Sequence, residues 1–125
     1  MRILLVTDDS RYADELASAA SERGVDFAQA AVGDDLDLTT TAHAPNVVVL
    51  DAHDALARTS RTATVFAALH PQIATVVVAN RAAKRRVGNV LVFDKWRSAE
   101  RLLGELERAY VGLSISTGSK HQAGA

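Results

Sequence analysis

Short aliphatic runs, each bounded by polar or turn residues, recur along the chain and predict β-strands. The clearest lie at residues 3–7 and 46–50, and further strands are predicted at residues 25–32, 75–79 and 90–93. The strongest runs are unbroken rather than alternating. That pattern is typical of strands buried on both faces, as in a parallel sheet covered by helices.

Apolar residues at helical spacing separate these strands. They predict helices near residues 10–24, 55–69 and 98–110, and a short helix is expected after the turn at residues 33–35. Only about ten residues, numbers 80–89, connect the last two strands, so the helix expected there is shortened or missing. The alternation of strands and helices predicts an α/β fold with a doubly wound, five-stranded parallel sheet.

Three acidic residues stand where strands are predicted to end. Asp8 and Asp9 follow the first strand, and Asp51 follows the third. Ligands of such sheets bind at the carboxyl ends of the strands, where these acids would converge. At an effective dielectric constant of about 20, two like charges about 4 Å apart repel by about 4 kcal/mol, so the cluster needs a cation or a shared proton. Oxygen donors of this kind suit Mg²⁺, and the sequence therefore predicts a divalent metal site.

With Lys95 after the last strand, the chain resembles the receiver domains of bacterial two-component response regulators over residues 2–113. The motifs that carry the resemblance are LLVTDDSR, VVVLDA and VFDK, in this order and at strand ends. The resemblance implies a flavodoxin-like fold and a phosphorelay protein rather than an enzyme. It also implies a histidine kinase or phosphotransfer protein as phosphodonor, and output through a downstream protein partner or a homodimer.

The same resemblance gives each site residue a role. Asp51 would accept the phosphoryl group and share in holding Mg²⁺. Asp9 would bind the metal directly, Asp8 would help through water, and the backbone carbonyl of His53 would supply another oxygen. Lys95 would pair with the aspartyl phosphate.

The chain departs from the receiver pattern at several positions. The fourth strand of a receiver normally ends with Ser or Thr, whose hydroxyl binds the phosphoryl oxygen, and here the position is Ala79 or, with a slip of one residue, Asn80. The aromatic residue expected three positions before the lysine is Val92, and the proline expected after it is Trp96. Ala79, Val92 and the loop after Asp51, which reads AHDALARTSR in place of the usual Met-Pro turn and Gly, motivate an alternative. It is a phosphorylation-independent pseudo-receiver that acts as an interaction or dimerisation module. A small metal-dependent hydrolase is a third interpretation, for which no general acid is evident.

Composition narrows the class of protein without naming a function. The 125 residues include no cysteine and carry a formal net charge of −1, which provides no overall basic field for nucleic acid or an anionic membrane. No apolar run is long enough to span a bilayer, and the first residues lack the features of a signal peptide. We expect a stand-alone cytoplasmic domain over residues 1–113, followed by a flexible tail at residues 114–125.

Overall fold

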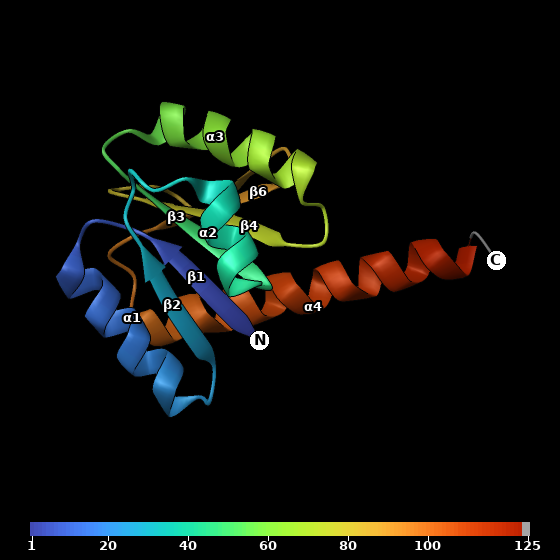
Figure 1. The fold of residues 1–125 in the computed structure, drawn as a ribbon, viewed down its shortest axis with the longest axis horizontal. Helices are drawn as coiled ribbons and strands as arrows, with labels where there is room; N and C mark the ends of the chain where they lie inside the picture. The colour runs from blue at the N-terminus through green and yellow to red at the C-terminus, as the bar shows by residue number, and fades with distance from the viewer. Residues whose placement is uncertain (124–125) are drawn as a thin grey trace.

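The strands of the protein form one six-stranded sheet in the computed structural model, which describes the backbone of residues 1–123 and the side chains of residues 1–113. In chain order the elements are β1 (Arg2–Val6), α1 (Ser10–Glu22), β2 (Asp26–Ala30), α2 (Leu36–His43), β3 (Val47–His53), α3 (Leu56–Leu69), β4 (Ala74–Ala79), β5 (Arg85–Val87), β6 (Val90–Asp94) and α4 (Ala99–Ala123). The strand order is β2-β1-β3-β4-β6-β5 (Figure 1). All neighbouring strands are parallel except β5, which is antiparallel to β6.

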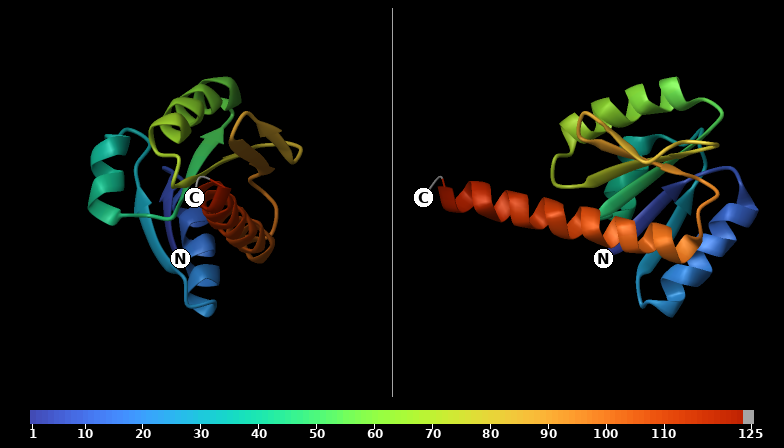
Figure 2. Two further views of the ribbon diagram at one scale, coloured as in Figure 1. Left: turned by 90° about the vertical axis from the view of Figure 1, so that its right-hand side faces the viewer. Right: turned by 180° about the vertical axis from the view of Figure 1, so that it is seen from behind.

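Helices cover both faces of this sheet and create two apolar cores. Leu16 of α1 and Leu106 of α4 are fully buried in the core on one face, while Phe66 of α3 is buried in the core on the other. Figure 2 shows the same division, with α1 beside α4, and an ion pair of 2.8 Å between Arg23 and Glu107 joins these two helices. The doubly wound, flavodoxin-like α/β fold predicted from the sequence is confirmed.

The segment between β4 and β6 contains no helix, as the short connection predicted. All of residues 80–89 is described, and they form β5 and two turns instead. Val87 pairs with Val90 across a two-residue turn, in which Gly88 has a φ of +61°. The prediction of five strands was therefore incomplete: the sixth is a short, exposed, mostly basic edge strand without the apolar pattern that marks the other five.

The last helix extends beyond its predicted end. The sequence predicts an end near Tyr110, whereas the backbone of α4 is helical to Ala123. Residues 114–123 of the predicted tail therefore belong to α4, and residues 124 and 125 lie outside the described part of the chain. The flexibility of this tail concerns motion and stays a prediction. None of the helices described is long and apolar enough to cross a membrane.

Candidate functional site

The candidate site is built where β1 and β3 end side by side. The two strands are parallel and paired in register, with Val6 opposite Leu50. Continuing this register by one residue places Thr7 opposite Asp51. The loop with Asp8 and Asp9 follows directly, so it lies at the same carboxyl ends of the strands. The convergence of these residues thus follows from strand pairing, as expected for the carboxyl ends of parallel strands.

Lys95 brings two of the acids together. Its backbone amide donates to the carbonyl of Ala79 (2.9 Å), which fixes the start of the loop after β6. Its Nζ atom lies 2.9 Å from Oδ2 of Asp51 and 3.0 Å from Oδ2 of Asp9. Lys95 is only 1% exposed, so one buried ammonium group bridges both carboxyl groups.

The charges of this cluster influence one another. Burial disfavours the charged form of Lys95, but hydrogen bonds to Asp51 and Asp9 outweigh that effect and raise the pKa of the lysine above its ordinary value. The hydrogen bond from Lys95 likewise holds the pKa of Asp9 below its ordinary value, and the backbone amide of Tyr12 adds to this effect. Lys95 and Asp9 therefore stay charged over a wide range of pH.

Asp9 performs a second task at the start of α1. Its Oδ1 atom accepts a hydrogen bond of 3.1 Å from the amide of Tyr12, which makes Asp9 the N-cap of the helix. Because Oδ1 faces the helix and Oδ2 faces Lys95, α1 itself orients the Asp9 carboxylate toward the site.

Thr7, which is not among the site residues predicted from the sequence, also contacts the carboxyl group of Asp51. Its Oγ1 atom donates a 2.6 Å hydrogen bond to Oδ2 of Asp51 and accepts one of 3.0 Å from the amide of Asp9. On the other side, Oδ1 of Asp51 accepts a 3.0 Å bond from the amide of His53. The available signal was a polar residue at the end of a strand predicted to be buried, which becomes informative once β1 is known to lie beside β3.

Asp8 and the carbonyl of His53 lie beside the cluster of Lys95, Asp9 and Asp51, and each accepts a hydrogen bond from a neighbouring loop. The Oδ1 atom of Asp8 accepts a bond of 3.0 Å from the amide of Val32, on the loop after β2. The carbonyl of His53 accepts one of 3.0 Å from the amide of Asn80, and His53 has a φ of +52°. Both groups lie at the carboxyl ends of the strands, whereas the ion pairs of the Lys95 ammonium are with Asp9 and Asp51.

Ala79 occupies the end of β4, and its neighbour Asn80 is directed elsewhere. The Asn80 side chain donates to Oδ1 of Asp54 (2.9 Å) and accepts from the indole N–H of Trp96 (2.7 Å). Trp96 is exposed, and the ammonium of Lys95 lies 5.2 Å from the centre of its ring. Asn80 therefore does not take the place of the missing hydroxyl, because its side-chain amide is bound to Asp54 and Trp96 instead.

The acids present suit a magnesium ion, although they do not form a complete cage. Among the side chains described, no three histidine, cysteine or acidic residues are grouped as metal ligands. Protein-bound Mg²⁺ commonly uses only one or two carboxylates and completes its octahedron with water and phosphate oxygens. Asp9 and Asp51, whose Oδ2 atoms share one ammonium group, provide such a pair.

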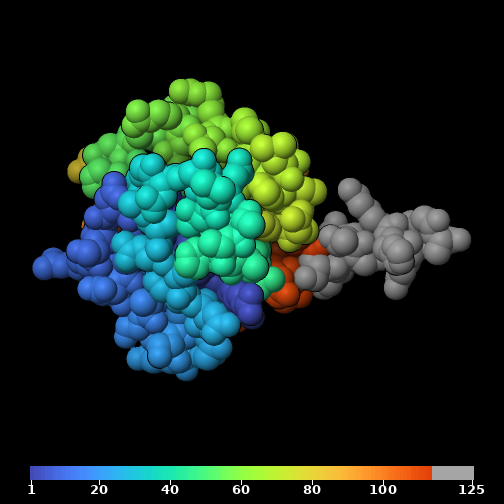
Figure 3. Space-filling view, viewed as in Figure 1, coloured from blue at the N-terminus to red at the C-terminus, as the bar shows by residue number. Residues whose placement is uncertain are grey.

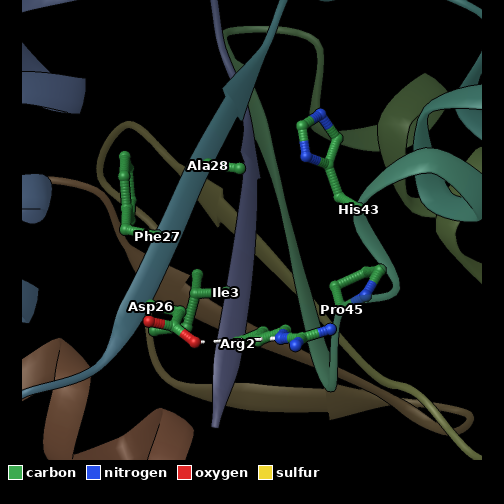
Figure 4. Close-up of a pocket in the computed structure, with 7 residues that line it drawn as sticks. All are labelled: Arg2, Ile3, Asp26, Phe27, Ala28, His43 and Pro45. Carbon is green, nitrogen blue, oxygen red and sulfur yellow. Dashed lines mark ion pairs between the residues drawn. The ribbon is translucent and has the colours of Figure 1, made fainter.

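Two surface cavities are separate from this cluster. One, of about 210 Å³, lies at the amino-terminal ends of the strands, between the starts of β1 and β2. Arg2 and Asp26 form an ion pair of 3.8 Å there (Figure 4). The other, of about 410 Å³, lies between α2 and α3 and is lined by Leu36, Val65 and Leu69, among others. Both of these helices are on the face shown in Figure 3. No residue of the predicted site lines either cavity.

Comparison with known proteins identifies the fold. Neither a protein-family model nor a curated protein matches the sequence. Among solved structures, NtrX from Brucella abortus in complex with ADP superposes with a TM-score of 0.73 at 19% identity, covering 97% of this chain. This chain spans only 28% of that NtrX chain.

Two further solved structures match over most of their own length. An atypical orphan response regulator with a phosphorylation-independent regulatory mechanism has a TM-score of 0.70 at 18% identity, covering 88% of this chain and 95% of its own. A CheY-like receiver domain from Methanospirillum hungatei has a TM-score of 0.68 at 15% identity, covering 92% and 97%. The fold is therefore that of response regulator receiver domains.

Proposed function

We propose that this protein is an atypical receiver module of two-component signalling, which accepts a phosphoryl group on Asp51. The observation that supports this proposal is the position of Lys95, whose buried ammonium group contacts both Asp51 and Asp9. An ammonium group between two acids offsets the repulsion that a carboxylate nucleophile meets when it approaches a phosphoryl group.

In the proposed reaction, an oxygen of Asp51 attacks the phosphorus atom of a phosphohistidine. A bond forms between phosphorus and the aspartyl oxygen, while the bond between phosphorus and the histidine nitrogen breaks and leaves its electron pair on the imidazole. Lys95 remains charged throughout and pairs with the new aspartyl phosphate. Lysine is ordinarily protonated at neutral pH, and the hydrogen bonds to Asp51 and Asp9 raise its pKa further despite its burial.

Asp9 and Asp51 are the residues that would hold Mg²⁺, with Asp8 acting through water and the His53 carbonyl as a further oxygen donor. When bound, the ion supplies positive charge to the phosphoryl oxygens. The hydrogen bond from the Tyr12 amide holds Oδ1 of Asp9. It thereby keeps Oδ2 directed toward Asp51 and the place where the ion would bind.

The proposed partners follow from this chemistry. A histidine kinase or phosphotransfer protein would donate the phosphoryl group, and a downstream protein or a second copy of this chain would read the phosphorylated state. A receiver of this kind changes the relative populations of two conformations, since the phosphoryl group makes different contacts in each. It is a signalling module rather than a turnover enzyme.

The direct test uses acetyl phosphate as phosphodonor. Intact protein is weighed after incubation with acetyl phosphate and Mg²⁺, with the metal omitted in a second sample. We expect the mass of one phosphoryl group to be added, only with metal present. Asp51→Asn should show no addition, whereas the control Asp14→Asn, an exposed acid on α1, should match the wild type. Equal modification of the wild type and Asp51→Asn would contradict the proposal.

A second candidate function is a pseudo-receiver that binds its partner without phosphorylation. The specific observation in its favour is Ala79, which leaves the end of β4 without the hydroxyl that the receiver pattern places there. The β5 hairpin also replaces the helix expected between the last two parallel strands. Under this alternative, the state of Asp51 has no effect on output.

The two functions differ in how assembly depends on Asp51. A receiver that signals through a second copy predicts a larger scattering mass after incubation with acetyl phosphate and Mg²⁺, and no change in Asp51→Ala. A pseudo-receiver predicts the same mass for both proteins under all conditions.

A further inference from the structure

The receiver pattern places a hydroxyl group at the end of the fourth strand, and this chain has alanine there. A different hydroxyl, that of Thr7 at the end of β1, lies 2.6 Å from Oδ2 of Asp51. The two positions lie on opposite sides of Asp51, because β3 pairs with β1 on one edge and with β4 on the other. The central carboxyl group therefore receives a hydroxyl hydrogen bond from the strand on its other side.

The bonds to Asp51 make its two oxygens unequal. Oδ2 accepts from the Thr7 hydroxyl and from the Lys95 ammonium. Once Lys95 pairs with the phosphoryl group, the lone pair that it leaves on Oδ2 is the one that Asp51 would offer to Mg²⁺. Oδ1 accepts only from the amide of His53, so one of its lone pairs has no protein donor among the described residues. A carboxylate attacks through a lone pair, and Oδ1 is the oxygen that can offer one.

Thr7 is held firmly enough to fix this arrangement. Its side chain is fully buried, and its hydroxyl accepts a bond from the amide of Asp9 while donating to Asp51. Its backbone amide donates to the carbonyl of Ala30 (3.0 Å), and its carbonyl accepts from the side chain of Gln29 (3.3 Å). The hydroxyl cannot rotate away from Asp51 without losing its own buried partners.

We infer that Thr7 is a positioning residue for phosphoryl transfer, which holds Oδ2 of Asp51 and presents Oδ1 to the phosphorus atom. The inference rests on the proposed function. In the transfer from acetyl phosphate, the bond between Oδ1 and phosphorus forms, and acetate leaves with the electron pair of the broken oxygen–phosphorus bond. Oδ2 becomes the carbonyl oxygen of the mixed anhydride, and the Thr7 proton stays on its own oxygen.

The experiment compares Thr7→Val, which removes the hydroxyl at nearly constant volume, with Thr7→Ser, which retains it. The readout is the rate constant for adduct formation at saturating acetyl phosphate with Mg²⁺, followed by intact mass. Adduct decay is followed after removal of the donor, so that slow formation is not confused with fast loss. Thr75→Val is the matched control, because the Thr75 hydroxyl is also buried in the sheet but has no hydrogen-bond partner among the described residues.

We expect Thr7→Val to form the adduct about 10-fold to 100-fold more slowly, since small misplacement of a reacting group has effects of this size. Thr7→Ser and Thr75→Val should stay within about threefold of the wild type. Wild-type rates in Thr7→Val would overturn the inference. So would equal slowing in Thr7→Val and Thr7→Ser with melting temperatures unchanged, because retaining the hydroxyl in Thr7→Ser would then not preserve the rate. An unmodified wild type is a different outcome, which rejects the proposed function and this inference with it.

Discussion

Lys95 is a charged side chain with almost no exposed surface, and the site depends on it. Burying an ammonium group is costly unless opposite charges and hydrogen bonds compensate, and here Asp51 and Asp9 provide both. The aromatic ring of Tyr12, whose centre is 5.1 Å from Nζ, adds a weaker favourable contact. The compensation is mutual, because the lysine is also what allows two acids to lie so close together.

Removing this lysine should therefore destabilise the fold. Lys95→Met leaves two acidic groups near each other without their shared cation, and we expect the free energy of unfolding to fall by about 2 to 4 kcal/mol in the absence of metal. The control Lys84→Met removes the ion pair between an exposed lysine and the half-buried Glu105 and should cost less than about 1 kcal/mol. Urea denaturation at neutral pH measures both. Similar losses in the two variants would show that the buried ion cluster contributes little.

The sequence identified residues whose type alone indicates chemistry, and missed those whose role depends on side-chain direction. Asp9, Asp51 and Lys95 could be predicted because charged residues at the ends of buried strands need partners. Thr7 could not, since a threonine at a strand end is ordinary until strand pairing places it beside Asp51. Asn80 was considered as a substitute for the missing hydroxyl, and only its bonds to Asp54 and Trp96 excluded it.

At the scale of elements, the hairpin of β5 and β6 is the main departure from the predicted architecture. Chain length was enough to predict that no full helix fits in residues 80–89, because a helix with two loops needs more residues. The strand itself was not predictable, since Arg85 and Arg86 are exposed and polar. Lys84, just before β5, reaches Glu105 of α4 at 3.1 Å and ties the hairpin to that helix.

The turn of this hairpin depends on Gly88, whose φ of +61° lies in the left-handed region. Gly88→Ala should lower the free energy of unfolding by about 1 kcal/mol, because a side chain is strained in that conformation. Gly33→Ala is the matched control, since an added methyl group there has no neighbour within 4 Å and the backbone is not left-handed. Urea midpoints of the two variants give the comparison. An equal effect at both positions would contradict the assignment of the turn.

At the scale of the whole molecule, two apolar cores on opposite faces of the sheet hold the site edge in place. β1, β3 and β4 contribute to both cores, so the strand ends that carry Asp51 and its neighbours are fixed from both sides. The general architecture was predictable because continuous aliphatic strands can be buried only between two helical layers. The length of α4 was not, because the sequence after Leu113 is small and polar.

This view predicts that residues 114–125 are dispensable for folding. Among the residues whose side chains are described, Leu113 is the last that packs against a core. A chain ending at Leu113 should keep the urea midpoint of the full chain and the same rate of adduct formation with acetyl phosphate. A clear loss of stability on truncation would mean that the domain extends beyond the boundary at residue 113.

The central claim is that Asp51, and no other residue, carries the phosphoryl group. The most direct test is to locate the added mass by fragmenting the protein after incubation with acetyl phosphate and Mg²⁺. The account predicts one phosphoryl group, on the fragment that contains Asp51. Modification at Asp8, at Asp9 or at a histidine, or the absence of any stable addition to folded wild-type protein, would contradict it.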